Sequence, residues 1–278
     1  MTLHVEEHGN GETLLLHQGL GQASWAWRYQ VPAFAQRFRT IVFDTRGTGR
    51  SPTPDDSYTI DDLAEDAAAI LDGRVAHVVG FSMGGYVALT LALAHPHLIR
   101  SLILCGTGAG GLDRVPRPDH VREAFEKART LQPEEQRRAT LPLTVSPGWP
   151  QANAERFEEI IAASLEHPTP LATIDAHTAA CYGYYDEHHD VERMDGAGFA
   201  TAEIAWGKAW TAAAWGLASG ALAERIGADP SFAAAVSVAT AGRFTPRQGA
   251  LPLPEGGAVG ASGGSSQQDE DVVRAAIG

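Results

Sequence analysis

The stretch best suited to covalent chemistry is Gly-Phe-Ser-Met-Gly-Gly at residues 80–85. A largely apolar run at 75–79 precedes it, and an unbroken run of helix-forming residues follows at 86–94. A serine on a tight strand-to-helix turn, a nucleophile elbow, presents its hydroxyl for acyl transfer and needs small neighbours. The turn also places Ser82 at a helix N-terminus, where free N–H groups favour a developing negative charge. The alternative, an ordinary Gly/Ser turn in the core, is disfavoured by the two flanks, so Ser82 is the candidate nucleophile.

Two further glycine-containing loops each follow a predicted buried strand. Gln-Gly-Leu-Gly at 18–21 comes after the strand at 13–16, and Asp-Thr-Arg-Gly-Thr-Gly-Arg-Ser at 44–51 comes after the strand at 40–43. In the second loop the glycines permit a sharp turn, which Asp44 and Arg46 can hold by hydrogen bonds. We therefore interpret the second loop as structural. The first loop is either an ordinary strand-to-helix connection or part of the reacting site.

The elements that would position these loops alternate between strand and helix. The chain begins with an edge strand at 3–8 and a Gly-Asn-Gly turn at 9–11. Apolar spacing predicts a helix over 25–38, disturbed by a proline, and a second helix from residue 59 that is capped by the Thr59/Asp62 pair. A further apolar strand follows at 101–105. Nearly all-apolar strands that alternate with helices specify a mostly parallel sheet with helices on both faces.

Residues 3 to about 110 resemble the α/β-hydrolase fold, in the branch that holds small esterases and enol-lactonases. The resemblance rests on the three loops, 18–21, 44–51 and 80–85, in this order. It implies a nucleophilic Ser82 and an oxyanion hole formed by the backbone N–H groups of Leu20 and Met83. Such donors are worth about 3–4 kcal/mol each in transition-state stabilisation. The family's usual histidine before the first glycine is replaced here by Gln18, which we expect to weaken the anchoring of the loop.

The resemblance also implies a helical cap, residues 112–193, inserted after the family's sixth strand, which is 101–105 here. Helix signals occur at 119–131, 133–139, 152–165 and 169–189, with prolines between them. The aromatic run at 182–185 either lines an acyl pocket or packs the cap against the sheet. The acidic and histidine cluster at 186–190 resembles a metal site, but neighbouring residues on a helix point to different faces. We interpret that cluster as solvated cap surface, and predict no metal and no cofactor.

The acid and base that this fold places after the cap are missing. An acyl-transfer serine needs a base to take its proton and an acid to orient the base, in the order Ser, Asp or Glu, His. The segment 204–210 matches the acid's register with Trp210 at the acid position, and the turn at 241–244 carries Arg243 at the histidine position. The last histidine is His189. Asp113 could replace the acid, but nothing there replaces the base.

Composition changes in the same region. Roughly a third of residues 196–241 are alanine, and 256–268 is rich in Gly and Ser. Helix-like pieces survive at 221–226 and 271–277. We therefore expect one hydrolase core, residues 1–111 and 194–278, in which 196–268 is divergent, partly low-complexity, and derived from a degraded or partly frame-shifted hydrolase C-terminus.

Charge and composition restrict the partners. A formal net charge of −13 argues against nucleic acid and against an anionic membrane surface. Two cysteines give no disulfide framework, and the N-terminus has no signal-peptide pattern. No segment is long and apolar enough to span a membrane. The sequence thus predicts a cytoplasmic protein with a small-molecule ester or lactone as substrate. It is compatible with a homodimer.

Three functions remain open from the sequence. The first is a serine hydrolase for a small carboxylic ester or lactone, impaired in this chain. The second is a hydrolase-fold binding protein whose pocket persists without a triad. The third keeps the fold for cofactor-free oxygenation or lyase chemistry, and ranks last because it too normally needs the histidine.

Overall fold

A computed structural model of the chain describes residues 1–108, 119–145, 148–186 and 200–204. Its centre is a six-stranded sheet with the order β1-β3-β2-β4-β5-β6. The strands are β1 (Val5–His8), β2 (Glu12–His17), β3 (Phe38–Phe43), β4 (Ala76–Phe81), β5 (Ile99–Cys105) and β6 (Ala200–Ile204).

All strand pairs in this sheet are parallel except one. The exception is β1, which pairs antiparallel with β3 at the edge. β2 pairs with β3 and β4, and β5 pairs with β4 and β6, all in parallel. Because parallel strands end at the same edge, the loops that follow β2, β3, β4 and β5 meet there. The predicted mostly parallel sheet is confirmed, and the three glycine-containing loops share one edge of it.

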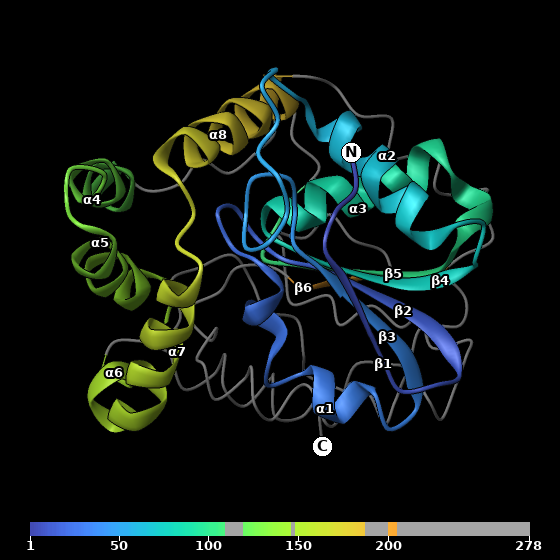
Figure 1. The fold of residues 1–278 in the computed structure, drawn as a ribbon, viewed down its shortest axis with the longest axis horizontal. Coiled ribbons are helices and arrows are strands. Elements are labelled where there is room, and N and C mark those ends of the chain that lie inside the picture. Colours follow the sequence, from blue (N-terminus) through green and yellow to red (C-terminus); the bar gives the residue numbers. More distant parts are fainter. Residues whose placement is uncertain (109–118, 146–147, 187–199, 205–278) are drawn as a thin grey trace, which may run out of the picture.

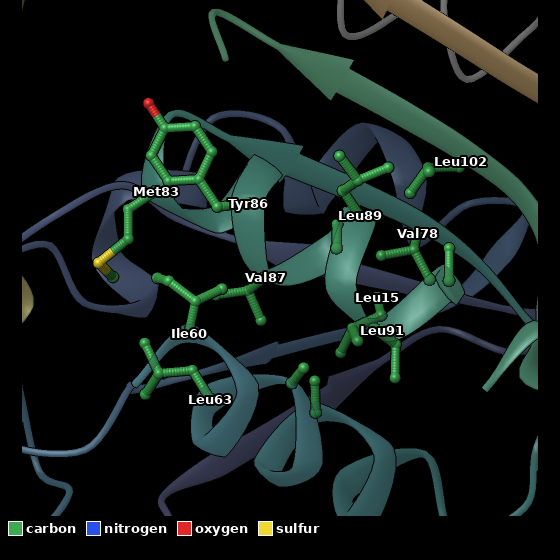
Figure 2. Packing of buried hydrophobic residues seen from close by; sticks show 14 of the residues in the cluster. Leu15, Ile60, Leu63, Val78, Met83, Tyr86, Val87, Leu89, Leu91 and Leu102 are labelled. Carbon is green, nitrogen blue, oxygen red and sulfur yellow. The ribbon is translucent and has the colours of Figure 1, made fainter. Parts of the chain in front are cut away.

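Helices cover both faces of the sheet. Figure 1 shows α2 (Ile60–Leu71) and α3 (Met83–Ala94) on one face and the short α1 (Val31–Phe34) on the other. α2 begins at the predicted cap, since the Thr59 side chain accepts from the Asp62 N–H and the Asp62 carboxylate accepts from the Thr59 N–H. In Figure 2 the side chains of Ile60 and Leu63 point from α2 towards α3, within the larger apolar core.

The predicted helix over 25–38 is wrong in most of its length. The structure has a 3₁₀ turn at Ser24–Trp27 and only one helical turn in α1. Pro32 lies in the first turn of α1, where the missing N–H costs nothing, so it starts a short helix and cannot lie inside a long one. Phe38 is the first residue of β3. Its apolar side chain belongs to a second core cluster on this face of the sheet.

The described residues between the end of β5 and β6 are mostly helical, at positions where the sequence carries helix signals. We call residues 119–186 the helical segment; β5 is the fifth strand of this chain and corresponds to the sixth in the family's count. Figure 1 shows its first helices grouped beside the sheet and α8 running towards α2 and α3. The bounds are α4 (Asp119–Ala128), α5 (Pro133–Thr140), η3 (Leu141–Thr144), α6 (Trp149–Ala152), α7 (Ala154–Glu166) and α8 (Leu171–Asp186).

Two other sequence expectations can be compared with the described residues. Cys105 and Cys181 are both buried and both free thiols, as the absence of a disulfide framework predicted. None of the described helices combines the length and apolar character needed to cross a bilayer. The expected boundaries at 111–112 and 193–194, and most of 196–268, lie outside the described residues.

Candidate active site

Ser82 lies at a strained turn between β4 and α3. Its backbone has φ 53° and ψ −119°, directly after the last residue of β4 and before the first residue of α3. Ser82 and Asp72 are the non-glycine residues with positive φ in the described part of the chain. A serine in this conformation costs on the order of 1–3 kcal/mol, which the surrounding structure must supply. The predicted strand-to-helix turn is confirmed, and the half-buried Ser82 occupies its apex.

Three glycines around Ser82 are required by close approaches, two of them to backbone and one to a side chain. A Cβ on Gly80 would lie 2.3 Å from the Gly84 carbonyl oxygen, and one on Gly84 would lie 2.3 Å from the His17 carbonyl oxygen. A Cβ on Gly85 would lie 2.3 Å from the Thr107 side chain. Gly84 therefore allows α3 to sit directly against the end of β2, which brings the Ser82 turn beside the 18–21 loop.

Two hydrogen bonds from β5 and the loop after it hold the backbone of Ser82. The Ser82 N–H donates to the Cys105 carbonyl at 2.9 Å, and the Thr107 hydroxyl donates to the Ser82 carbonyl at 2.8 Å. Sequence reasoning did not single out Thr107, whose only signal is its place just beyond a buried strand. Burial raises the pKa of the Cys105 thiol to about 12, so this thiol is not a competing nucleophile at neutral pH.

Within residues 19–22, one backbone N–H has no acceptor among the described residues. The Gly19 N–H donates to the Gln22 side-chain oxygen at 3.1 Å, the Gln22 N–H to the Gly19 carbonyl at 3.2 Å, and the Gly21 N–H to a histidine on α8. The Leu20 N–H has no acceptor within the described residues. Met83, as the first residue of α3, likewise has an N–H without an intrahelical acceptor. The structure thus places both predicted oxyanion donors on the turns that flank the contact of Gly84 with β2.

The side chain of Gln18 anchors this loop to the end of β3. Its fully buried side-chain amide donates to the Phe43 carbonyl at 2.8 Å and to the Thr45 hydroxyl at 2.9 Å. The loop after β2 is therefore fastened to the end of β3 and to the turn that follows. The expected weakening by Gln18 is offset by these two bonds, which a glutamine amide is able to donate.

The turn at 44–51 has the predicted structural role, and the hydrogen bonds of Asp44 and Arg46 show how it is held. The Asp44 carboxylate accepts from the Ser24 N–H at 2.8 Å and from the Arg50 N–H at 2.8 Å. Burial alone would raise the pKa of Asp44, but these bonds hold it below its ordinary value. Arg46 does not bind Asp44; it forms a two-point ion pair with Asp66 of α2, at 2.8 and 2.7 Å. Asp44 therefore holds the turn by hydrogen bonds, and Arg46 fastens it to α2.

Two buried imidazoles lie close to the 18–22 loop. His17 Nδ1 donates to the Gln18 carbonyl at 3.0 Å, which leaves the Nε2 lone pair without a partner among the described residues. Burial lowers the pKa of His17 to about 4 and that of His177, on α8, to about 4. Within the described residues no imidazole is hydrogen-bonded to the Ser82 hydroxyl. The positions of Asp113, Trp210 and Arg243 lie outside the described residues.

The aromatic run at 182–185 packs the helical segment against the core. The ring of Tyr184 stacks on Tyr86 of α3 with centroids 4.7 Å apart, and the hydroxyls of Tyr86 and Tyr185 are 2.5 Å apart. Tyr182 is exposed. The packing interpretation is therefore supported for the two inner tyrosines. No group of potential metal ligands occurs among the described residues, and residues 187–190 of the acidic and histidine cluster lie outside them.

Comparison with known proteins assigns the fold family. A sequence model of the alpha/beta hydrolase fold family matches residues 12–158, which is more than half of the chain. The chain belongs to the alpha/beta hydrolase fold family. This confirms the resemblance drawn from the three loops and is consistent with the sheet order and the Ser82 turn.

Particular relatives carry the names of hydrolases. A putative carbamate hydrolase RutD of Azorhizobium caulinodans is 34% identical over 59% of this chain and 63% of its own length. A pimeloyl-[acyl-carrier protein] methyl ester esterase of Aeromonas hydrophila is 42% identical over 37% of this chain and 41% of its own. The crystal structure of an enol-lactonase from Burkholderia xenovorans has a TM-score of 0.58 at 26% identity, covering 73% and 77% of the two chains. The chain thus spans less than two thirds of the length of these two curated relatives.

The C-terminal third is similar to a different family. A model described as haem degrading protein HbpS-like matches residues 189–278. This match contains β6 and also the positions of Trp210 and Arg243, which were read as the hydrolase acid and base positions. It coincides with the change in composition near residue 196.

Proposed function

We propose that this chain carries the nucleophile and oxyanion hole of a serine hydrolase that acts on a small carboxylic ester or lactone. The observation that carries the proposal is the strained backbone of Ser82 at φ 53°, between β4 and α3, with small residues at 80, 84 and 85. Strain of this kind is found where a fold holds a reacting group in place. The hydrolase names of the relatives support the same reaction class.

In the proposed reaction the Ser82 hydroxyl oxygen attacks the carbonyl carbon of the ester or lactone. The carbonyl oxygen becomes negatively charged and accepts hydrogen bonds from the Leu20 and Met83 N–H groups, assisted by the N-terminal end of α3. The C–O bond of the leaving alcohol then breaks to give an acyl-serine, which water hydrolyses. The hydroxyl proton must go to a base in the first step and return to the leaving alcohol in the second.

That base is the missing part. A serine hydroxyl is a poor nucleophile at neutral pH without an adjacent base, and the described residues present none in contact with Ser82. Loss of the histidine from a comparable triad costs about 10⁶-fold in turnover. The oxyanion hole and binding alone leave about 10³–10⁴-fold over water. We therefore expect ester hydrolysis by this chain at or near background.

Short-chain nitrophenyl esters and a fluorophosphonate probe test this proposal, with Ser82→Ala as the blank. We expect weak labelling that disappears in the blank, and turnover close to that of the blank. Robust turnover that depends on Ser82 would show that a base is present, and His17 or a histidine of the helical segment would be the first to replace. Labelling that persists in the blank would contradict the role of Ser82.

The competing proposal is a hydrolase-fold protein that binds a small molecule without turning it over. Both proposals share the position of Ser82, and they differ in whether the serine reacts. A ligand that stabilises the wild-type chain and Ser82→Ala equally, without labelling of either, would favour the binding protein.

The C-terminal match supports a second, separate proposal. We infer that residues 189–278 derive from a family of haem-associated proteins and do not complete the hydrolase triad. Titration of the full chain with haemin, followed by the Soret band, tests for haem binding. A saturable spectral shift that the Ser82→Ala control also shows would support haem binding. The spectrum of free haemin at all ratios would contradict haem binding by this chain.

A further inference from the structure

Two side chains of the helical segment form hydrogen bonds with Gly21, in the loop after β2. The Gly21 N–H donates to Nδ1 of His177 at 3.2 Å, and the Gly21 carbonyl accepts from the Thr169 hydroxyl at 2.9 Å. The two side chains therefore occupy both polar groups of a single peptide residue, from positions about 150 residues further along the chain. Gly21 has φ +66°, a conformation that glycine adopts readily and that most other residues avoid.

The tautomer of His177 is fixed by this contact. Because an N–H donates to Nδ1, that nitrogen must carry its lone pair, and the ring proton lies on Nε2. His177 is entirely buried, and its ring meets Tyr58 edge to face at a centroid distance of 5.8 Å. The imidazole is therefore held as a hydrogen-bond acceptor, and its Nδ1 is not available to take a proton from Ser82.

We call the two hydrogen bonds to Gly21, from Thr169 and to His177, the clamp. Side chains of α8 around the clamp leave little room for the loop to move. A Cβ on Gly21 would lie 3.4 Å from the Ile174 side chain, so α8 lies directly over this residue. The preceding residue of α8 is Thr173, and its side chain would be 2.6 Å from a Cβ on Gly47, in the turn after β3. Below the loop, the Gln18 amide holds the other end. The loop is thus fixed from the sheet side at Gln18 and from the α8 side at Gly21.

Gly19 and Leu20 lie between these two anchors, and Leu20 is the one that adjoins Gly21. Its N–H is the donor in the 19–22 stretch that has no acceptor among the described residues, while those of Gly19, Gly21 and Gln22 are occupied. The direction of a peptide N–H is set by the torsions on both sides of it. The Leu20 N–H belongs to the Gly19–Leu20 peptide, whose carbonyl accepts from the Gln22 N–H at 3.2 Å. Gly21 lies inside that turn, so holding both of its polar groups supports the turn that orients the Leu20 N–H.

We propose that Thr169 and His177 are positioning residues that fix the Leu20 N–H as an oxyanion donor. The proposal rests on the function proposed above, since it assigns a catalytic purpose to the Leu20 N–H. Both residues lie in the helical segment, so this segment completes the oxyanion hole in addition to covering the core. Neither residue touches the substrate in this proposal, and both act through Gly21.

Two matched pairs of variants separate the hydrogen bonds from the packing. Thr169→Val removes the donor at nearly constant volume, and Thr169→Ser keeps it. His177→Leu removes the acceptor, and His177→Asn keeps an acceptor oxygen close to the position of Nδ1. Amide hydrogen exchange of Gly21 and Leu20 is measured by ¹H–¹⁵N spectroscopy on the full chain, beside the rate at which a fluorophosphonate labels Ser82.

We expect His177→Leu and Thr169→Val to speed exchange at Gly21 by at least tenfold and to slow labelling by about 10²-fold, the usual effect of losing one oxyanion donor. His177→Asn and Thr169→Ser should stay within about threefold of the wild-type chain in both measurements. Faster exchange with unchanged labelling, or no rescue by the conservative variants, would overturn the proposal. Unchanged exchange in His177→Leu and Thr169→Val would show that the two hydrogen bonds do not hold Gly21.

The two proposals fail in different ways. If the wild-type chain shows no labelling that depends on Ser82, the proposed hydrolase function fails and the catalytic purpose of Leu20 fails with it. The exchange rates then still decide whether Thr169 and His177 hold the loop. If labelling depends on Ser82 but not on the clamp, only the present inference is wrong.

Discussion

Ser82 and Gly84 are constrained by the contacts that their backbone makes with neighbouring strands. Ser82 keeps a positive φ because its N–H and carbonyl are each bonded to β5 or the loop after it. Gly84 permits the contact between α3 and the end of β2, since a Cβ would lie 2.3 Å from a carbonyl oxygen. The Gly-x-Ser-x-Gly pattern predicted both features, because the need for small residues at a strained turn is local in sequence.

Replacement of Gly84 by alanine tests this steric requirement. Gly84→Ala should destabilise the chain by about 3 kcal/mol, the upper part of the usual range for overpacking, because rigid backbone must move. The matched control is Gly183→Ala within α8, where a Cβ meets nothing within 4 Å. There we expect a gain of about 0.5–1 kcal/mol from the better helix former. Urea unfolding of both variants measures the difference, and equal effects would contradict the steric explanation.

The buried imidazoles predict a loss of stability in mild acid. His17 and His177 have pKa values of about 4 when folded, below the ordinary 6.5, mainly because of burial. The unfolded chain therefore binds more protons between pH 6.5 and 4, so the free energy of unfolding falls as pH decreases through this window. The loss is on the order of 3 kcal/mol for each histidine.

Urea unfolding at several pH values between 7 and 4 measures this loss. His177→Asn should flatten the pH dependence relative to the wild-type chain, because one of the two titrating groups is removed. The control His97→Asn changes an exposed imidazole and measures the effect of replacing a histidine at the surface. A slope unaffected by His177→Asn would mean that this group does not titrate with folding.

Elements that depend on local signals were predictable, and those that depend on distant contacts were not. α2 follows its capping box and its apolar face closely, with Ile60, Leu63 and Leu71 buried. The 25–38 segment carries similar apolar spacing, but Phe38 is needed in β3, so tertiary packing overrides the helical pattern. The clamp on Gly21 has no sequence signal, since Thr169 and His177 are about 150 residues away from it.

The cap of α2 gives an element-level prediction. Thr59→Ala removes the side chain that accepts from the Asp62 N–H at 3.2 Å, and should lower the free energy of unfolding by about 1 kcal/mol. Thr59→Ser keeps the hydroxyl and should cost much less. Chemical denaturation measures both. Because α2 also holds Arg46 through Asp66, a far larger loss in Thr59→Ala would indicate that the cap also supports the turn after β3.

At the scale of the whole molecule, the N-terminal part of the chain and its C-terminal third match two different protein families. The hydrolase family matches 12–158, and the HbpS-like family matches 189–278. The sequence predicted that other residues stand at the usual acid and base positions and showed that composition changes, but a single sequence held no signal for a second family. The match in the given reading frame argues against the frame-shift interpretation. Translation of the other two frames over codons 196–268 tests it directly: it survives only if a strand ending in Gly-x-x-Asp and a Gly-His turn are found.

A graft of the C-terminal third separates the remaining interpretations of this region. In the graft, residues 189–278 are replaced by the corresponding C-terminal third of the Azorhizobium caulinodans relative. If the present chain lacks only an acid and a base, the graft should raise turnover of nitrophenyl esters by several orders of magnitude, towards the roughly 10⁶-fold that a triad histidine supplies. Ser82→Ala within the graft should abolish the gain.

The double variant Trp210→Asp with Arg243→His is the companion measurement. If residues 194–278 are a divergent hydrolase core, the double variant should also raise turnover, and each single change should do less because acid and imidazole act as a unit. If 189–278 belong to the second family, the graft should restore activity and the double variant should not, since neither position then faces Ser82. Failure of the graft, in a chain that folds as shown by cooperative unfolding, would instead mean that the Ser82 turn and its oxyanion donors are not a competent hydrolase site.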